Sequence, residues 1–282
     1  MSRSHKVQQH IDSLHEISEI MNAMRNLSLV EAKKINQFIA VQTQAVNTIK
    51  SAACDFLHFY PEFYRQPSVV NKIIVIIGSE RGFCGDYNVK LVRALDTYLE
   101  SFTDIHPVLI PLGYKIHSKF EDVEAVDQMI PGPSVTEEIN AVIANLIEVL
   151  NTITVREGII DVNILHMTDE SEEPVITRLL PAFIEDVKLA SQFYTKPDIN
   201  IEPVELFKNL VEEYVFAKLN NILFSSLKAE SQQRVSHLEN ALNKLNENIT
   251  SLTMKRNEIR QEDITEEIEI IMLGDSLFLE EE

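Results

Sequence analysis

The stretch VSHLENALNKLNENITSLTMKRNEI, from Val235 to Ile259, decides the fold of this 282-residue chain. Its apolar residues recur in alternating steps of three and four, and Arg256 takes one position of the series. The apolar members are Val235, Leu238, Leu242, Leu245, Ile249, Leu252 and Ile259. This spacing is the heptad pattern of a coiled coil. We expect the seam to face a partner, because a long helix with one wet apolar seam is not stable alone.

The distribution of glycine and proline along the chain indicates which segment is that partner. Neither residue occurs from Met1 to Tyr60 or from Val204 to Leu273. The second stretch allows about 70 residues of helix, roughly 105 Å at 1.5 Å per residue. The first carries a thinner apolar stripe made of Ile11, Leu14, Ile17, Met21, Met24, Ile35 and Phe38. We therefore predict an antiparallel coiled coil of an N-terminal helix (1–62) and a C-terminal helix (204–282), while separate packing of each helix on the middle of the chain is the alternative.

The middle of the chain alternates between strand and helix patterns. The segments 69–79, 106–113 and 158–168 have the composition of buried strands, and 174–181 is a candidate fourth strand. The segments 89–102 and 134–153 have the period of amphipathic helices. This alternation predicts a mainly parallel sheet with helices on its faces. The fold class is thus α/β, a long coiled coil with an inserted Rossmann-like α/β domain at 69–200.

Composition excludes several classes of function. The formal charge of −19 argues against nucleic-acid binding, which needs a basic surface. The longest purely apolar run, Ile73–Ile77, is far shorter than the roughly 20 residues that span a bilayer. The N-terminal segment lacks the apolar core of a signal peptide. We expect any membrane association to be indirect, and the two cysteines, Cys54 and Cys84, to be reduced.

One stretch has the look of an enzyme loop. In IIGSERGFCGDYN (76–88), glycines follow a strand and precede a helix, as in phosphate-binding loops. However, Gly85 is followed by Asp86 rather than by Lys and Ser or Thr, and the dinucleotide fingerprint G-x-G-x-x-G is absent. A structural turn is the favoured interpretation, in which Arg81 could pair with an acidic neighbour. Cys84 is more often a small buried side chain than a nucleophile at such a place.

The other ionisable residues form no catalytic or metal-binding pattern. The eight histidines are scattered, without the spacing of a zinc site. From Gln261 to Glu282 the chain has nine acidic residues and no lysine or arginine. A solvated helix face explains such a run, and a charged helix end placed against a specific partner is the sharper alternative. We therefore predict no catalytic residues, no cofactor and no metal.

Four motifs resemble the gamma subunit of F-type ATP synthases, the central rotor shaft. The stretch RNEIRQEDITEEIEIIMLGD (256–275) is similar to the family's C-terminal motif, and GSERGFCGDYN (78–88) to its glycine-containing loop. IMNAMRNLS (20–28) resembles the family's N-terminal motif, and AESQQR (229–234) a further one. The matching residues are Asn257, Arg260, Gln261, Ile264, Thr265, Glu267, Ile270, Gly274, Ser79, Arg81, Gly82, Cys84, Gly85, Asn88, Ile20, Ala23, Met24, Arg25, Glu230 and Arg234.

The resemblance implies a non-catalytic rotor. Arg260, Gln261 and Thr265 would contact the catch loops of the catalytic β subunits, inside a ring of three α and three β subunits. Met24 and Arg25 would lie in the neck, facing the acidic lever loop of β.

The same resemblance implies where the rest of the chain acts. The α/β domain, with Arg81, Gly82, Cys84 and Gly85 in a structural loop, would sit at the foot with the epsilon subunit and the ring of c subunits. The complex would couple proton or sodium flow to ATP synthesis or hydrolysis at the cytoplasmic face of a bacterial inner membrane.

Some positions depart from the family pattern. Glu19 and Asn22 replace lysines, Asp86 replaces a glycine, and the tip GDSLFLEEE (274–282) replaces a small apolar one. We interpret these departures as a divergent branch, of the kind represented by alternative ion-translocating F-type operons of bacteria. Two rival classes are a coiled-coil adaptor unrelated to ATP synthesis and a nucleotide-binding enzyme with helical arms.

Overall fold

The computed structural model describes residues 3–63, 71–102, 107–121, 123–158, 160–168, 170–171, 173–183, 196 and 198–279. The predicted domain limits at 69 and 282 lie outside these ranges, and the predicted domain boundaries stay a prediction. By internal contacts the chain divides into a first unit, Met1–Leu27 with Ser236–Glu282, and a second unit, Ser28–Val235.

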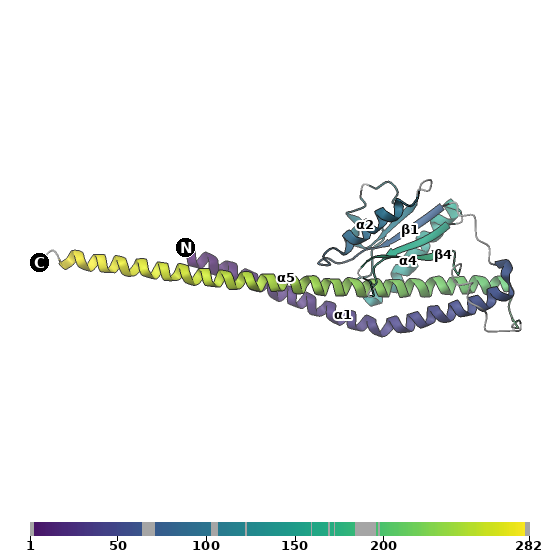
Figure 1. The fold of residues 1–282 in the computed structure, drawn as a ribbon, viewed down its shortest axis with the longest axis horizontal. Helices are drawn as coiled ribbons and strands as arrows, with labels where there is room; N and C mark the ends of the chain where they lie inside the picture. Colours follow the sequence, from purple (N-terminus) through teal and green to yellow (C-terminus); the bar gives the residue numbers. More distant parts are fainter. Residues whose placement is uncertain are drawn as a thin grey trace. The chain divides into compact units, whose positions relative to one another are not determined.

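Two long helices supply both ends of the chain (Figure 1). Helix α1 runs from Arg3 to Phe59 and helix α5 from Pro203 to Leu279. Pro61 follows the end of α1, as expected because a proline disfavours helix in the residue before it. Pro203 is the first residue of α5, where its missing N–H costs no hydrogen bond. The predicted pair of terminal helices is confirmed.

In the first unit the two helices share the predicted seam. On α5, Leu238, Leu242 and Ile249 are buried, and Arg256 is half-buried with its guanidinium donating to Gln8 Oε1 of α1. The seam of α1 keeps heptad spacing but includes polar residues; it runs through Ser4, Val7, Ile11, Leu14, Ser18, Met21 and Arg25.

Ile17, predicted to lie in this stripe, is instead 46% exposed. The reason is that consecutive steps of three drift off the seam, so the step after Leu14 is four residues and falls on Ser18.

In the second unit the same helices run antiparallel. Phe38 of α1 stacks on Phe224 of α5 with 5.6 Å between ring centroids, and the Asn221 side chain donates to Thr43 Oγ1. The residue numbers of the contacts therefore decrease along α5 as they increase along α1, which defines an antiparallel pair. Phe38 stays 42% exposed despite this stacking.

The second unit also holds a four-stranded sheet. Its strands are β1 (Asn71–Ile77), β2 (Val108–Leu112), β3 (Ile160–His166) and β4 (Val175–Leu180). Their order is β2-β1-β3-β4. The first three strands are parallel, and β4 pairs antiparallel with β3. The mainly parallel sheet and its fourth strand are confirmed.

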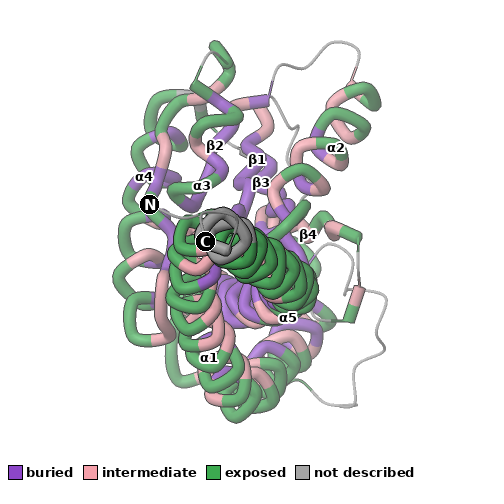
Figure 2. The backbone as a smooth tube through the Cα atoms, turned by 90° about the vertical axis from the view of Figure 1, so that its left-hand side faces the viewer, coloured by how far each residue is buried: buried purple, intermediate pink, exposed green. Residues whose placement is uncertain are grey.

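Both faces of the sheet are covered, which explains the continuous apolar run of β1. Ile73, Val75 and Ile77 face a core formed with α4 (Ile139–Glu157) and with parts of α1 and α5. Ile74 and Ile76 face the opposite core, formed with α2 (Tyr87–Leu99) and the short α3 (Tyr114–His117). Figure 2 shows β1 and β3 buried between α4 on one side and α2 on the other. Short 3-10 turns at Pro61–Phe63 and Thr136–Glu138 complete the elements.

Helix α4, expected from its sequence to be an ordinary amphipathic helix, is unusually apolar. By length and composition Thr136–Arg156, with a mean hydropathy of 1.3, is the one segment among the described residues that could cross a membrane. Yet Ile139, Ile143, Leu146, Val149 and Ile153 of this helix are buried in the first core. In this structure α4 is therefore a core helix that covers the sheet.

We predict that Leu219→Ala lowers the stability of the chain by about 2–5 kcal/mol, because it deletes a fully buried side chain between α5 and the sheet. Urea unfolding of the purified chain measures the change. The matched control is Val204→Ala on the same helix, where the side chain is 67% exposed and the effect should stay within about 0.5 kcal/mol. Equal effects of the two substitutions would contradict the packing described here.

A second prediction concerns pH. His166 is buried at the end of β3; its Nδ1–H donates to the Met167 carbonyl over 3.1 Å, and its Nε2 accepts from the Thr177 hydroxyl over 3.0 Å. Burial lowers the pKa of His166 to about 4, and Lys218 acts in the same direction. An unfolded histidine binds its proton near pH 6.5, so the unfolded state gains protons first as the pH falls. Stability should therefore decrease from about pH 6.5 towards pH 4.

Thermal unfolding across this pH range tests the assignment. His166→Gln should flatten the decline, whatever its effect on the absolute stability, because the glutamine does not titrate. His237→Gln, at an exposed histidine, is the control and should leave the slope unchanged. An unaltered slope in His166→Gln would show that other groups cause the decline.

Candidate functional site

The glycine loop (Gly78–Asn88) joins β1 to α2 in the second unit. Gly78 is required because a Cβ there would lie 2.5 Å from Cβ of Ile116. Gly85 has a positive φ of 58°, and Phe83, at φ 63°, is a non-glycine residue in the same left-handed region. The Phe83 side chain is 53% exposed at the tip of the loop. A bulky residue in this conformation needs surroundings that hold the backbone in place.

Helix α5 supplies those surroundings through one ion pair. Glu230 and Arg234 are 4% and 5% exposed and lie one turn apart, and their side chains form a short salt bridge. The Glu230 carboxylate also accepts from the backbone N–H of Glu80 over 3.4 Å and of Arg81 over 3.2 Å. Arg234 Nε donates to the Gly82 carbonyl over 3.0 Å. The pair therefore contacts consecutive residues of the glycine loop and fixes their backbone.

Cys84 completes this cluster from inside the loop. Its Sγ lies 3.3 Å from Arg234 Nη2, and its thiol is directed at the carbonyl oxygens of Arg81 and Gly82, each at 3.4 Å. Burial, reinforced by the charge of Glu230, raises the pKa of Cys84 to about 12. A thiol with this pKa is almost fully protonated at neutral pH and is a poor nucleophile. The structural interpretation of the loop is thus supported against the catalytic one.

Other contacts tie the loop to the rest of the second unit. Ser79 and Asn88 are joined by two hydrogen bonds, one from the Ser79 N–H to Asn88 Oδ1 and one from Asn88 Nδ2 to Ser79 Oγ. The Glu80 carboxylate accepts from the N–H groups of Tyr114 over 2.8 Å and Gly132 over 2.7 Å. Gln233 of α5 donates to Asp86 over 3.0 Å. The loop is therefore a joint between α5 and the segments that follow β2.

The acidic neighbour expected for Arg81 is Glu230 of α5, but the side chain that pairs with it is a different one. Arg81 contacts Glu230 through its backbone N–H, and it is Arg234 that carries the positive charge of the pair. The available signal was an opposite charge pair four residues apart on α5, flanked by Leu227, Ala229 and Ser231. Charges at helical spacing within such an apolar and small-residue setting indicate a buried pair.

The predicted neck residues, Met24 and Arg25, are half-buried in α1 of the first unit. Arg25 occupies a seam position, where its Nη2 donates to Asn26 Oδ1 over 3.1 Å. Its Nε is buried and has no hydrogen-bond partner within the described ranges. The structure thus places only part of the guanidinium where another subunit could reach it.

The predicted catch residues, Arg260, Gln261 and Thr265, are exposed on α5 of the first unit. Gln261 and Thr265 line one shallow groove of the helix surface, and Arg260 is not part of it. The groove is lined by Glu258, Gln261, Glu262, Thr265, Glu266 and Glu269. The Thr265 hydroxyl donates to the Gln261 carbonyl over 2.9 Å, so only the hydroxyl oxygen is free to accept.

This part of α5 extends past its helical partner. Arg256 contacts Gln8, and α1 begins at Arg3, so the antiparallel pairing leaves no described α1 residue opposite the helix beyond about Gln261. Ile264, Ile268 and Ile271 are accordingly 45%, 52% and 65% exposed. Apolar side chains along an unpaired helix indicate a surface that another protein covers. The predicted acidic residues Glu280, Glu281 and Glu282 lie outside the described residues.

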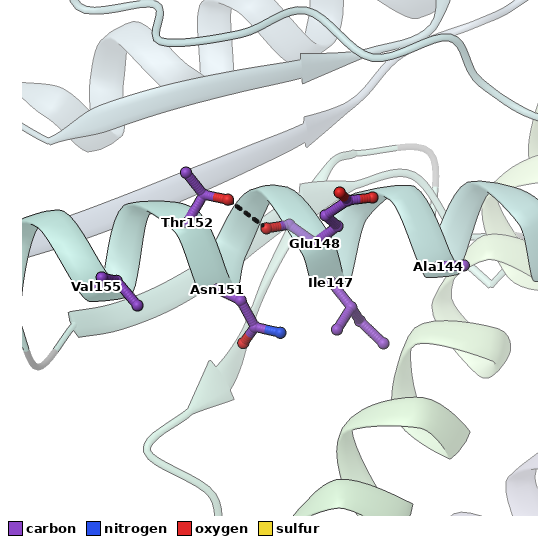
Figure 3. A pocket seen from close by; sticks show the side chains of 6 residues that line it. All are labelled: Ala144, Ile147, Glu148, Asn151, Thr152 and Val155. Atoms are coloured by element: carbon purple, nitrogen blue, oxygen red, sulfur yellow. Dashed lines mark hydrogen bonds between the residues drawn. The ribbon is translucent and has the colours of Figure 1, made fainter.

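A second hollow lies apart from these surfaces, in the second unit. This hollow on the outer face of α4 is lined by Ala144, Ile147, Glu148, Asn151, Thr152 and Val155, all from a single helix (Figure 3). The Thr152 hydroxyl donates to the Glu148 carbonyl over 2.9 Å and is thereby used within the helix. Among the described residues no three His, Cys, Asp or Glu side chains gather as metal ligands.

Comparison with known proteins gives the class to which this arrangement belongs. A family model described as ATP synthase matches residues 3–276. An ATP synthase gamma chain of Bdellovibrio bacteriovorus is 27% identical over 94% of this chain and 95% of its own length. One of Rickettsia prowazekii is 26% identical over 97% of this chain and 99% of its own length.

Solved structures agree in fold. A chain of the rotor of the Euglena gracilis mitochondrial ATP synthase covers 93% of this chain, with a TM-score of 0.66 and 15% identity. A chain of the central stalk and c ring of the Tetrahymena thermophila enzyme covers 79%, with a TM-score of 0.57 and 17% identity. This chain therefore belongs to the ATP synthase family, and its curated relatives named above are gamma chains.

The environment of Cys84 makes a testable prediction. Since its pKa is raised to about 12 and its side chain is buried, a thiol reagent should leave Cys84 unmodified in the native chain at pH 8. Mass spectrometry of labelled peptides measures the modification. A Thr48→Cys variant, at an exposed site on α1, is the positive control. Rapid labelling of Cys84 in the folded protein would contradict a closed cluster, and labelling in denaturant confirms that the thiol is free.

Proposed function

We propose that this chain is the central stalk of an F-type ATP synthase and transmits rotation between a membrane ion channel and a catalytic head. Its relatives are named gamma chains rather than catalytic subunits, and the chain itself is a non-catalytic stalk subunit. The observation that carries the proposal is the end of α5, a helix with exposed polar and apolar residues and no described α1 residue beside it. Such a helix is built to be enclosed by other subunits.

The head contacts are assigned to α5. Arg260, Gln261 and Thr265 bind the catch loops of β subunits within a ring of three α and three β subunits. Gln261 and Thr265 share one helix face, so together they contact one neighbouring β subunit at a time. A rotating helix of this kind favours the open or closed form of each β subunit in turn, because its contacts differ between orientations.

The neck contact is assigned to Met24 and Arg25, opposite the lever loop of β. Arg25 shares its guanidinium between the α1–α5 seam and this outer contact. Glu19 and Asn22, where the family has lysines, leave Arg25 as the main positive charge of this segment, so the grip on an acidic loop is weaker.

The α/β domain is assigned to the foot of the stalk, where it binds the epsilon subunit and the ring of c subunits. The homologues are chains of a membrane-associated complex. We place this one at the cytoplasmic face of a bacterial inner membrane, attached indirectly through the c ring. Proton or sodium ions drive the rotation.

The proposal predicts the outcome of reconstitution with the α and β subunits of the same organism. Native mass spectrometry should show one copy of this chain with three α and three β subunits. The double substitution Arg260→Ala with Gln261→Ala should lower ATP hydrolysis by the assembled complex roughly tenfold, as expected from the loss of about 1–2 kcal/mol of hydrogen bonds.

The matched control is Glu239→Ala, an exposed position on the same helix but away from the catch residues. Normal hydrolysis by the double variant within an intact ring would remove the catch assignment and keep the stalk. Failure of the chain to enter any ring would instead favour the coiled-coil adaptor.

A further inference from the structure

The buried pair Glu230–Arg234 lies close to the point at which α5 passes from the second unit of the chain into the first. Val235 is the last residue of α5 within the second unit, and α5 continues directly into the first unit at Ser236. Under the proposed function the first unit carries the catch residues, so torque enters the second unit through the covalent continuation of α5 and α1. The latch cluster is defined as Glu230, Arg234 and the loop residues Glu80–Cys84. Its two α5 members, Glu230 and Arg234, lie within the last two turns of α5 before this crossing.

We propose that Glu230 and Arg234 are positioning residues that latch the glycine loop onto α5, so that α5 and the sheet turn together under load. The proposal rests on the proposed function and adds to it a joint that transmits torque inside the second unit.

Geometry favours a latch over simple packing. Apolar contacts between α5 and the sheet resist separation, but the hydrophobic effect has no preferred direction and does not by itself fix one orientation of the loop backbone. Charge-assisted hydrogen bonds have defined directions. Glu230 holds the N–H groups of Glu80 and Arg81, and Arg234 holds the Gly82 carbonyl one helical turn further on. Two attachment points separated along the helix axis oppose rotation of α5 against the loop.

The energetics of burial support the same conclusion. Burial raises the pKa of the Glu230 carboxyl, while Arg234 and the two loop N–H groups act against this rise. A buried ion pair is seldom more stable than a well-packed apolar pair of similar size, because both charges lose their water. Stability of the fold alone therefore does not call for charges at these two positions. Directional attachment of the loop backbone, in contrast, does require charged groups at these two positions.

The loop has further attachments that the latch alone does not explain. Tyr87 donates to the Ser226 carbonyl of α5 over 3.4 Å, and Ser226 donates to the Met167 carbonyl that follows β3 over 3.3 Å. Through these bonds the loop, α5 and the end of β3 form one connected group of polar contacts. Loosening the latch should therefore affect the link to the sheet without removing the apolar core.

The test uses the complete complex in lipid vesicles and measures ATP hydrolysis and ATP-driven ion uptake together, with probes for protons and for sodium. Arg234→Lys keeps the charge but lacks the planar fork that reaches Glu230 and Gly82 at once. It should assemble and hydrolyse ATP while losing ion uptake per ATP. The combined substitution Glu230→Leu with Arg234→Met removes both buried charges, so its stability should recover relative to either single change while its coupling does not.

A direct readout accompanies the coupling assay. Hydrogen exchange at the Glu80 and Arg81 amides, measured by mass spectrometry in the assembled complex, should accelerate in Arg234→Lys. The matched control is Gln233→Ala, which removes the peripheral bond to Asp86 and leaves the pair intact. It should keep both ion uptake and slow exchange at these amides.

The outcomes separate the latch from the proposed function. Wild-type ion uptake per ATP in Arg234→Lys would overturn the latch, and so would recovery of coupling in the double variant. Loss of uptake with hydrolysis retained supports it. If the wild-type complex itself neither assembles nor pumps, the stalk function fails, which is a distinct result seen before any variant is made. Should the double variant not fold, Arg234→Lys decides the question by itself.

Discussion

Neither terminal helix can bury its apolar seam alone, and the rest of the molecule depends on their antiparallel pairing. In the first unit this pairing places Arg256 of α5 beside Gln8 of α1, and in the second unit Phe224 beside Phe38. Heptad spacing keeps the seam on one side of each helix, even where Ser18 or Arg25 takes a seam position. Small and polar residues there weaken the seam without breaking its register. The pairing also helps to cover the sheet, because parts of both helices join α4 over one face.

The second unit shows why a stalk subunit would carry an α/β layer. The sheet is buried on both faces and is therefore stiff, since close-packed interiors transmit strain. Helix α5 crosses into the other unit immediately after the Glu230–Arg234 pair. The apolar core stabilises the fold. The polar contacts between α5 and the glycine loop fix the orientation of the loop relative to the helix. A subunit without chemistry of its own has to specify orientation, and hydrogen bonds with charged groups do so better than apolar contacts.

The end of α5 in the first unit differs from this buried sheet, because its side chains are exposed. Beyond the reach of α1 its isoleucines and glutamates face outwards, which would be unfavourable for a free protein and suits a helix enclosed by other subunits. The acidic departure at Glu19 lies on an exposed position of α1 rather than in the core. A charge at such a position changes what a neighbouring subunit meets and leaves the core packing of the chain unaltered.

The sequence by itself determined the two long terminal helices and the order in which the strands follow one another along the chain, because periodicity and proline placement are local properties. It favoured a structural turn for the glycine loop, since the loop spacing fits no phosphate-binding motif. It also indicated the family through motifs at 20–28, 78–88, 229–234 and 256–275. Only the tertiary structure decided that Ser18 rather than Ile17 enters the seam, that Arg25 is half-buried, and that Glu230 binds the backbone of a loop about 150 positions earlier. Such facts depend on the rotation of each helix and on contacts distant in sequence, and no local pattern records them.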